Sequence, residues 1–223
     1  MVLAFLQDQK IDKLLCIGDV VGYGAEPSRC LGKILEAGCD MVAGNHDFAA
    51  VGKISIDYFN IFAKESTLWT QRNLTEEDKK ALMRQPLVRE YEGFTLVHGS
   101  LYKPQAFDYV QTIIDAIYSF KELDRQILFI GHSHVPITFI EGDSISFSAN
   151  ETIEIKDGKR YIINVGSVGQ PRDEDTRSSL AIYDTDARLV RICRVEYDIE
   201  TAGRKIIEAG LPEINAERLK IGR

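Results

Sequence analysis

The chain has 223 residues and a net charge of −7, with 27 Lys and Arg against 34 Asp and Glu. Hydrophobic residues make up 44% of the chain and charged residues 27%, a balance typical of a soluble globular protein. The negative charge argues against general binding to the nucleic-acid backbone. No apolar run approaches the roughly 20 residues that cross a membrane.

The cysteines and the N-terminus indicate a cytoplasmic protein. Cys16, Cys30, Cys39 and Cys193 show no Cys-x-x-Cys spacing, so free thiols in a reducing compartment are expected. The first six residues lack the basic start and the small-residue cleavage site of a signal peptide.

The first quarter of the chain alternates between helices and strands. Residues 2–9 predict a helix, and the apolar run 13–17 predicts a strand buried on both faces. A proline opens a predicted helix over 27–37, and the next strand covers 40–43. This order of strand, helix and strand predicts parallel pairing of the two strands.

The next stretch predicts two helices and a hairpin. Thr75 precedes three acidic residues and begins a helix that ends by 85–86. Residues 87–91 and 94–97 flank Glu92-Gly93 and predict a hairpin. Before them, residues 54–74 predict a helix with an apolar stripe that is expected to face the core, formed by Tyr58, Ile61, Phe62, Leu68 and Trp69.

The second half of the chain is rich in short strands. A helix over 108–120 precedes a buried strand at 127–130, and a helix near 200–209 precedes a charged tail. Between them lie predicted strands at 137–140, 144–147, 152–155, 160–165, 180–183 and 189–195. Two packed sheets with helices outside fit one domain over residues 1–223 better than two domains.

Four loops share one construction, in which an apolar strand ends in a side chain that is able to bind a metal. Sites in open α/β sheets form beyond the carboxyl ends of the strands, and mixed Asp, Asn and His ligands suit Mn, Fe, Zn or Ni. The competing interpretation is that the histidines are structural and only cap strand ends. The side chains concerned are Asp19, Asn45 with His46, His98, and His132 with His134.

These loops resemble the motifs of one family. Gly-Asp-x-Val-Gly-Tyr-Gly at 18–24, Gly-Asn-His-Asp at 44–47, Val-His-Gly-Ser at 97–100 and Gly-His-Ser-His at 131–134 occur in the order of the calcineurin-like metallophosphoesterases. The loop at 164–172 also matches, and the chain most resembles the small prokaryotic phosphodiesterase-like branch. The resemblance implies a four-layer α/β/β/α sandwich with two mixed β-sheets, and hydrolysis of a phosphomonoester or phosphodiester.

The resemblance also implies a role for each side chain. Asp19 bridges two divalent cations, with manganese the first expectation, and Asn45, His98 and His132 complete one metal site. His134 binds the other metal. Two such cations withdraw charge from the phosphoryl oxygens and turn a bridging water into hydroxide.

The remaining roles concern the substrate, expected to be a small phosphorylated compound or a nucleotide. The resemblance implies that His46 contacts the phosphate, together with Asn45, and protonates the leaving oxygen. Asp47 is a candidate to orient His46, and a surface or capping role fits it equally. Arg172 has the geometry to contact a phosphate, although a solvated loop arginine is the simpler interpretation.

One family motif is absent. The family carries an Asp-x-His at the end of a first strand, and both residues bind the metal that His134 shares, but no histidine precedes His46 here. Either the sequence is truncated or one metal site has been lost. We therefore expect one firmly bound metal, and the alternative function is metal or phosphate binding without catalysis. A missing strand beside the one that carries Asp19 also exposes a sheet edge, so self-association is expected.

Overall fold

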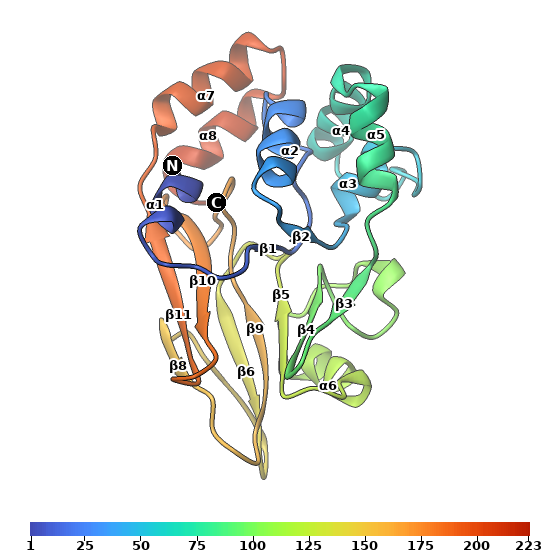
Figure 1. The fold of residues 1–223 in the computed structure, drawn as a ribbon. Helices are drawn as coiled ribbons and strands as arrows, with labels where there is room; N and C mark the ends of the chain where they lie inside the picture. Colours follow the sequence, from blue (N-terminus) through green and yellow to red (C-terminus); the bar gives the residue numbers. More distant parts are fainter.

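The computed structural model describes residues 1–223, and its largest element is a six-stranded mixed sheet (Figure 1). Side by side, the strands are β3 (Val88–Glu90), β4 (Phe94–Val97), β5 (Ile127–Ile130), β9 (Arg160–Asn164), β6 (Ile137–Glu141) and β7 (Ile145–Ser148). Strands β4, β5 and β9 run parallel, whereas β3, β6 and β7 pair antiparallel with their neighbours. The parallel strands therefore bring their carboxyl ends to one edge of the sheet.

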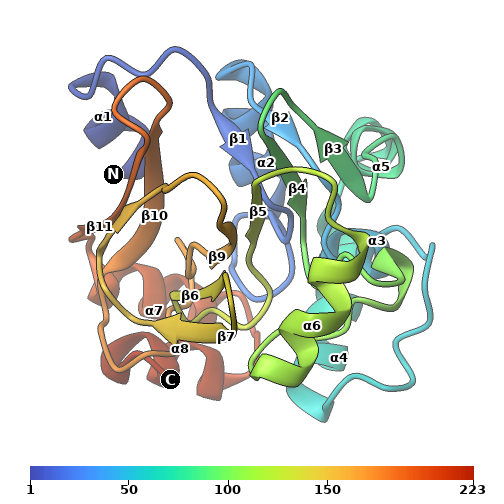
Figure 2. The ribbon, with the colours of Figure 1, turned by 90° about the horizontal axis from the view of Figure 1, so that it is seen from below.

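Two smaller groups of strands form a second layer. Strands β10 (Ser178–Asp184), β11 (Leu189–Val195) and β8 (Thr152–Glu154) form an antiparallel sheet, and β1 (Leu15–Cys16) pairs in parallel with β2 (Asp40–Met41). Figure 2 shows the layers end-on, with β10 and β11 on one side of β5 and β9 and helix α6 (Ile113–Glu122) on the other. The predicted mixed α/β fold with several sheets is confirmed.

The second layer of the sandwich consists of two separate groups of strands, where the family resemblance implies one mixed sheet. It is divided because β1 hydrogen-bonds only to β2, and β10 only to β11. The other edge of β1 thus carries no strand partner within the chain. Self-association through such an edge stays a prediction.

Two apolar cores lie on the two faces of the large sheet. Phe129 and Ile163 pack in one buried cluster with Val190 of the smaller sheet. On the opposite face, Leu128 packs in a second cluster with Phe120 of α6. Alternate residues of β5 thus enter different cores, which explains why this strand is apolar throughout.

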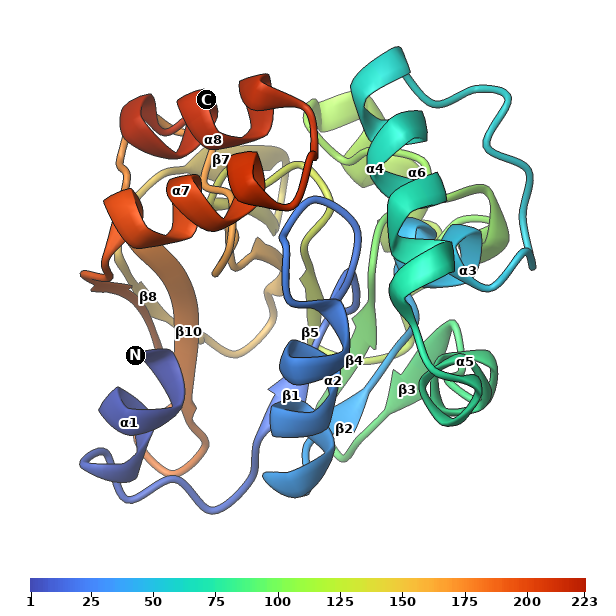
Figure 3. The same cartoon turned by 90° about the horizontal axis from the view of Figure 1, so that it is seen from above.

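Most helices gather at the end of the sheets where the parallel strands finish (Figures 1 and 3). Seen from above, α7 and α8 lie as an antiparallel pair beside α2 and α4 (Figure 3). None of the helices has both the length and the apolar composition to span a bilayer. Their bounds are α1 (Val2–Gln7), α2 (Pro27–Glu36), α3 (Asn45–Ala50), α4 (Ile61–Asn73), α5 (Glu76–Met83), α7 (Ile199–Glu208) and α8 (Glu213–Ile221), with a 3-10 turn η1 (Pro104–Ala106) before α6.

The predicted core-facing stripe of α4 is wrong. Tyr58 precedes the helix and is 98% exposed, and Ile61 is 64% exposed, while Phe62 and Leu68 also face outward. Of these five side chains, only Trp69 is partly buried. Its indole N–H donates to the carbonyl oxygen of Ala209, the C-cap residue of α7, at 2.9 Å.

The buried face of α4 is instead made of small residues. Ser66, Thr67 and Thr70 are fully buried, and each hydroxyl donates to the backbone carbonyl four residues earlier at 2.7–2.8 Å. Because these hydroxyls are satisfied within the helix, the face can be buried despite its polarity. Periodicity identified an apolar stripe but not the side on which the helix packs.

Other predicted elements agree with the structure to within a few residues. Helix α6 begins later than predicted because Thr112 accepts from the N–H of Asp115 and caps it there. Two short helices were not predicted, α3 after β2 and α8 in the expected charged tail. Helix α8 carries buried Ala216 and Leu219 among its charges, and these pack against α7.

Candidate metal centre

The four loops with metal-competent side chains meet at one place. Asp19 follows β1, His98 follows β4 and His132 follows β5. The Nε2 atom of His98 lies 3.1 Å from Asp19 Oδ2 and 3.1 Å from His132 Nδ1. The three potential ligand atoms all lie within 4.8 Å of one another. One carboxylate and two imidazoles therefore converge on a common point, a donor set that fits a borderline divalent cation.

Asn45 provides a second observation in favour of a cation. It is the first residue of α3, and its Oδ1 atom is buried without any hydrogen-bond partner. An unsatisfied buried acceptor costs about 1–3 kcal/mol. The next residue, His46, donates its backbone N–H to Asp19 Oδ1 at 2.9 Å, so the start of α3 lies directly against Asp19. A bound cation is the kind of partner that this amide oxygen lacks.

Two of the histidines have a defined tautomer. His98 Nδ1 lies 2.6 Å from the carbonyl oxygen of Ile17, and His134 Nδ1 lies 2.7 Å from that of Gln170. A carbonyl oxygen only accepts, so Nδ1 is the protonated nitrogen in each ring. An imidazole fixed through Nδ1 in this way presents its Nε2, the arrangement that typically orients a metal-binding histidine. In His98 this Nε2 lies 3.1 Å from both Asp19 Oδ2 and His132 Nδ1.

The electrostatic surroundings act differently on the three histidines: burial opposes the charged form of His98, but the adjacent Asp19 raises its pKa, whereas His132 and His134 stay neutral. Burial, reinforced by His98, lowers the pKa of His132 to about 3, and burial with Arg172 nearby lowers that of His134 to about 3. Burial opposes ionisation of Asp19, but the adjacent His98 holds the pKa of its carboxyl below the ordinary range. Both imidazoles are therefore neutral, and the carboxylate is charged, at neutral pH.

The backbone at the ligands is held in a costly conformation. Asp19, His132 and His134 have φ values of 53°, 64° and 63°, in the left-handed region that residues with a Cβ seldom adopt. Buried Asn164 holds the loop that carries both histidines, because its Nδ2 donates to the carbonyl of Gly131 at 2.5 Å and to Ser133 Oγ at 2.9 Å. Strain that the surroundings maintain in this way is typical of functional sites.

Asp47 organises the loop around Asp19. Its fully buried carboxylate accepts backbone N–H groups from Asp19 at 2.7 Å, Val20 at 2.9 Å, Val21 at 3.3 Å and Gly44 at 2.9 Å. It makes no hydrogen bond to the His46 side chain. Of the two interpretations from the sequence, the capping role is therefore the one that the geometry supports.

His46 lies in an aromatic enclosure beside the triad. Its ring centroid is 4.5 Å from that of Tyr23 and 5.0 Å from that of Phe59, and burial lowers its pKa. A Cβ on Gly22 would lie 2.7 Å from His46 Nδ1, so this close approach requires glycine. The Nδ1 atom is buried beside Gly22 and has no hydrogen-bond partner within the chain.

Arg172 lies close to His134 and is only partly exposed. Its backbone N–H donates to the carbonyl of His134 at 3.2 Å, and its guanidinium lies 5.6 Å from the ring centroid of Tyr23. One Nη donates to Gln170 Oε1 at 2.8 Å, but its buried Nε has no partner. A free N–H at this position offers a donor for an anionic ligand.

Sequence reasoning missed two aromatic residues that pack on the triad. Tyr109 stacks on His132 with ring centroids 4.0 Å apart and planes 15° apart, and Phe107 lies edge-on to His98 at 6.1 Å. Both lie in the loop between η1 and α6, where no periodic pattern marks them. The only feature of the sequence that could have associated them with the site is their position shortly after the Val-His-Gly-Ser motif.

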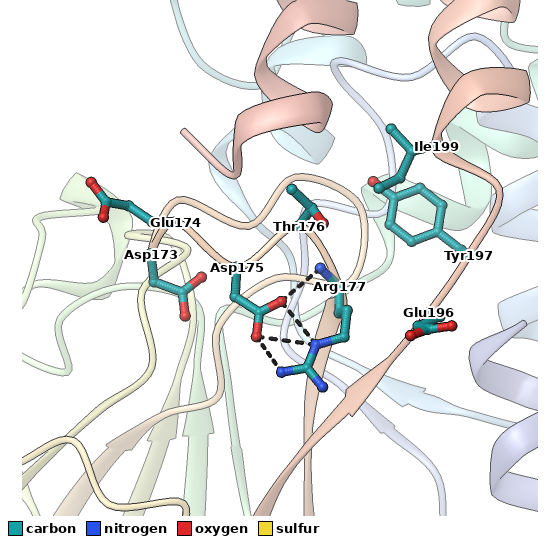
Figure 4. Close-up of a pocket in the computed structure, with 8 residues that line it drawn as sticks. All are labelled: Asp173, Glu174, Asp175, Thr176, Arg177, Glu196, Tyr197 and Ile199. Atoms are coloured by element: carbon teal, nitrogen blue, oxygen red, sulfur yellow. Dashed lines mark hydrogen bonds and ion pairs between the residues drawn. The ribbon is translucent and has the colours of Figure 1, made fainter.

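One cavity of the chain lies away from the triad. It has a volume of about 640 Å³ and contains none of the five side chains predicted to bind metal (Figure 4). Asp175 accepts from Arg177 at 2.6 Å within it, so part of its charge is already paired. Its lining consists of Asp173, Glu174, Asp175, Thr176, Arg177, Glu196, Tyr197 and Ile199.

Comparison with known proteins identifies the family. The model of the calcineurin-like phosphoesterase superfamily domain matches residues 1–188. The chain is 37% identical to the uncharacterized protein MJ0912 of Methanocaldococcus jannaschii, over all of this chain and 91% of that protein. The match covers most of both proteins, so the similarity is not confined to the metal-site motifs.

Solved structures agree with this result. A metallophosphoesterase from Sphaerobacter thermophilus superposes with a TM-score of 0.87 at 36% identity, over all of this chain and 93% of that one. The hypothetical protein PH1004 from Pyrococcus horikoshii OT3 shares the fold with a TM-score of 0.76 at 17% identity, over all of this chain and 90% of that one. The chain therefore belongs to the calcineurin-like phosphoesterase superfamily.

Proposed function

We propose that this chain is a metal-dependent phosphoesterase that hydrolyses phosphomonoesters or phosphodiesters of small molecules. The observation that carries the proposal is the convergence of Asp19, His98 and His132, in which Asp19 Oδ2 and His132 Nδ1 each lie 3.1 Å from His98 Nε2. The buried, unpaired oxygen of Asn45 supports a fourth ligand. Membership of a phosphoesterase superfamily makes hydrolysis the reaction class that this set of residues fits best.

In this proposal the metal-binding residues hold and orient a cation. A divalent cation supplies charge neutralisation of the phosphoryl oxygens and lowers the pKa of water at the site. Asp19, His98, His132 and Asn45 would hold one ion. His134 presents a free Nε2 that would share a second ion with Asp19. These two residues alone form a weak second site, so we expect one tightly bound ion per chain.

Two further residues would act on the substrate. His46 lies directly beside Asp19, to which its backbone N–H donates, but has no place among the converging ligand atoms, which suits hydrogen bonding to the phosphate and proton transfer to the leaving oxygen. Arg172 would direct its free Nε–H to a phosphate oxygen. Neither residue needs to bind metal for these roles, so catalysis and metal binding are separable by mutation.

The test is hydrolysis of bis-p-nitrophenyl phosphate by the metal-stripped chain, with and without added manganese. We expect turnover only with manganese, and one manganese ion per chain by elemental analysis. In the His46→Ala variant, turnover should fall by about 10²–10⁴-fold, the usual contribution of a general acid, while the manganese content stays the same.

The outcomes separate the two candidate functions. Manganese binding without turnover of any phosphoester would favour the alternative, a protein that binds metal or phosphate without catalysis. A His46→Ala variant with full turnover would remove the assigned role of that histidine. Turnover in the stripped chain after exhaustive chelation would contradict the metal-dependent mechanism itself.

A further inference from the structure

We propose that Tyr109 is a positioning residue, which fixes the imidazole of His132 in its metal-binding orientation by stacking on it. The inference rests on the proposed role of His132 as a metal ligand. It concerns a residue that lies outside every motif of the sequence, on the loop that joins η1 to α6.

The need for such a residue follows from the hydrogen bonds of the three histidines. His98 and His134 are each fixed by a carbonyl oxygen that accepts from Nδ1. His132 has no such partner: its Nδ1 faces His98 Nε2 at 3.1 Å, and its Nε2 makes no hydrogen bond within the chain. This hydrogen bond joins two of the nitrogens that would bind the cation, so it would be lost on metal binding. No other hydrogen bond within the chain then restrains rotation of the His132 ring about its Cβ–Cγ bond.

Stacking on Tyr109 supplies the missing restraint. The two rings lie 4.0 Å apart at an angle of 15°, which is an almost parallel contact. Turning the His132 ring out of this plane would drive its edge into the tyrosine. Tyr109 is itself 47% exposed, and its aromatic contact is with the His132 ring.

The loop that carries Tyr109 is anchored so that the restraint is rigid. Phe107 adopts a left-handed φ of 54° and is buried between Phe48 and His98. The carbonyl of Asp108 accepts the N–H of Ser100 at 2.9 Å. The loop is thus fixed to the chain just after His98, and it contacts both histidines of the triad with successive aromatic residues.

The contact fits the behaviour of groups that orient metal ligands. Loss of a group that contacts a metal ligand, without binding the metal itself, typically weakens metal binding by 10–100-fold. Because stacking is weaker and less directional than a hydrogen bond from a carboxylate, the lower end of this range applies. We expect the Tyr109→Leu variant to bind manganese about ten-fold more weakly than the native chain.

The experiment compares three variants of the metal-stripped chain. Titration calorimetry measures the dissociation constant of manganese, and proton NMR of the metal-free chain measures the ring resonances of His132, assigned with His132→Asn. Tyr109→Leu should weaken binding and remove the ring-current shift of these resonances. Tyr109→Phe keeps the stacked ring and should preserve both properties.

Tyr118→Leu is a matched control, because Tyr118 is also 47% exposed but packs on Tyr102. It should leave both properties unchanged. Native manganese affinity in Tyr109→Leu would overturn the proposal, as would equal losses in Tyr109→Leu and Tyr118→Leu. Should Tyr109→Leu fail to fold, Tyr109→Gln takes its place with the same expected results.

The NMR measurement keeps this inference separate from the proposed function. If the native chain binds no manganese, the assignment of the metal centre fails. The ring resonances of the metal-free chain then still show whether Tyr109 orients His132. An unshifted His132 spectrum in the native chain contradicts the stacking whatever the metal content.

Discussion

Asp47 is the residue on which the shape of the Asp19 loop depends. Four backbone N–H groups point at one buried carboxylate, and three of them belong to residues 19–21. Burial and the neighbouring Asp19 raise the pKa of this carboxyl to about 7, while the backbone N–H groups of Gly44 and Val21 favour its ionised form. The four hydrogen bonds also hold Asp19 in its left-handed conformation, so a structural residue determines where a ligand points.

The Asp47→Asn variant tests this dependence. An amide turns an NH₂ group toward N–H donors, so some of these donors lose their acceptor. We expect the free energy of unfolding to fall by about 3 kcal/mol, measured by urea denaturation. The control is Asp57→Asn, whose exposed side chain is 3.8 Å from Lys64, and its expected change is below about 0.5 kcal/mol. Equal stability of the two variants would show that the four bonds contribute nothing net.

Helix α4 was predicted from the sequence, but the face that was expected to be buried is exposed. Its apolar positions Ile61 and Leu68 are exposed, and its buried positions are small. Small residues let a helix approach its neighbours closely, and here Asn215 of α8 donates to Ser66 Oγ at 2.8 Å. The packing of α4 therefore depends on fit and hydrogen bonding more than on apolar area.

Paired substitutions on α4 test this orientation. Ile61→Lys should change the free energy of unfolding by less than about 0.5 kcal/mol, because the side chain already lies in water. Ala63→Leu adds volume at a buried position and should cost about 1–3 kcal/mol. Both values follow from thermal or urea denaturation. If Ile61→Lys lowers the free energy of unfolding more than Ala63→Leu does, the apolar stripe of α4 faces the core after all, as the sequence predicted.

On the scale of the whole molecule, the metal centre joins the two layers of the fold. Asp19 and Asn45 follow β1 and β2 of the second layer, whereas His98 and His132 follow β4 and β5 of the large sheet. A cation held by both sets is a cross-link that exists only in the folded chain. Its binding free energy therefore adds to the stability of the whole molecule.

Manganese should accordingly stabilise the native chain against unfolding. At a free concentration 100-fold above the dissociation constant, the expected gain is about 2.7 kcal/mol, seen as a higher midpoint of urea or thermal denaturation. His98→Ala removes the residue at the centre of the triad and should abolish the gain. A similar stabilisation of both proteins would place the bound ion elsewhere on the molecule.

The arrangement of strands and loops was largely predictable from the sequence. Strand β5 was predicted with its observed bounds, because a run of four apolar residues that ends in glycine is short for a helix and typical of a strand buried on both faces. Polar side chains that directly follow such strands lie at the sheet edge by necessity. The positions of Asp19, His98 and His132 follow from this, since parallel strands bring their carboxyl ends together.

The sequence by itself thus determined the order of the strands and of most helices, and the edge at which the histidines and Asp19 meet. Hydrophobic periodicity and turn chemistry are local properties of the sequence, and they are enough to predict where strands end and which side chains follow them. Only the tertiary structure decided the outward face of α4, the capping role of Asp47 and the stacking of Tyr109 on His132. Each of these depends on contacts between segments distant in the sequence, which leave no periodic pattern along the chain.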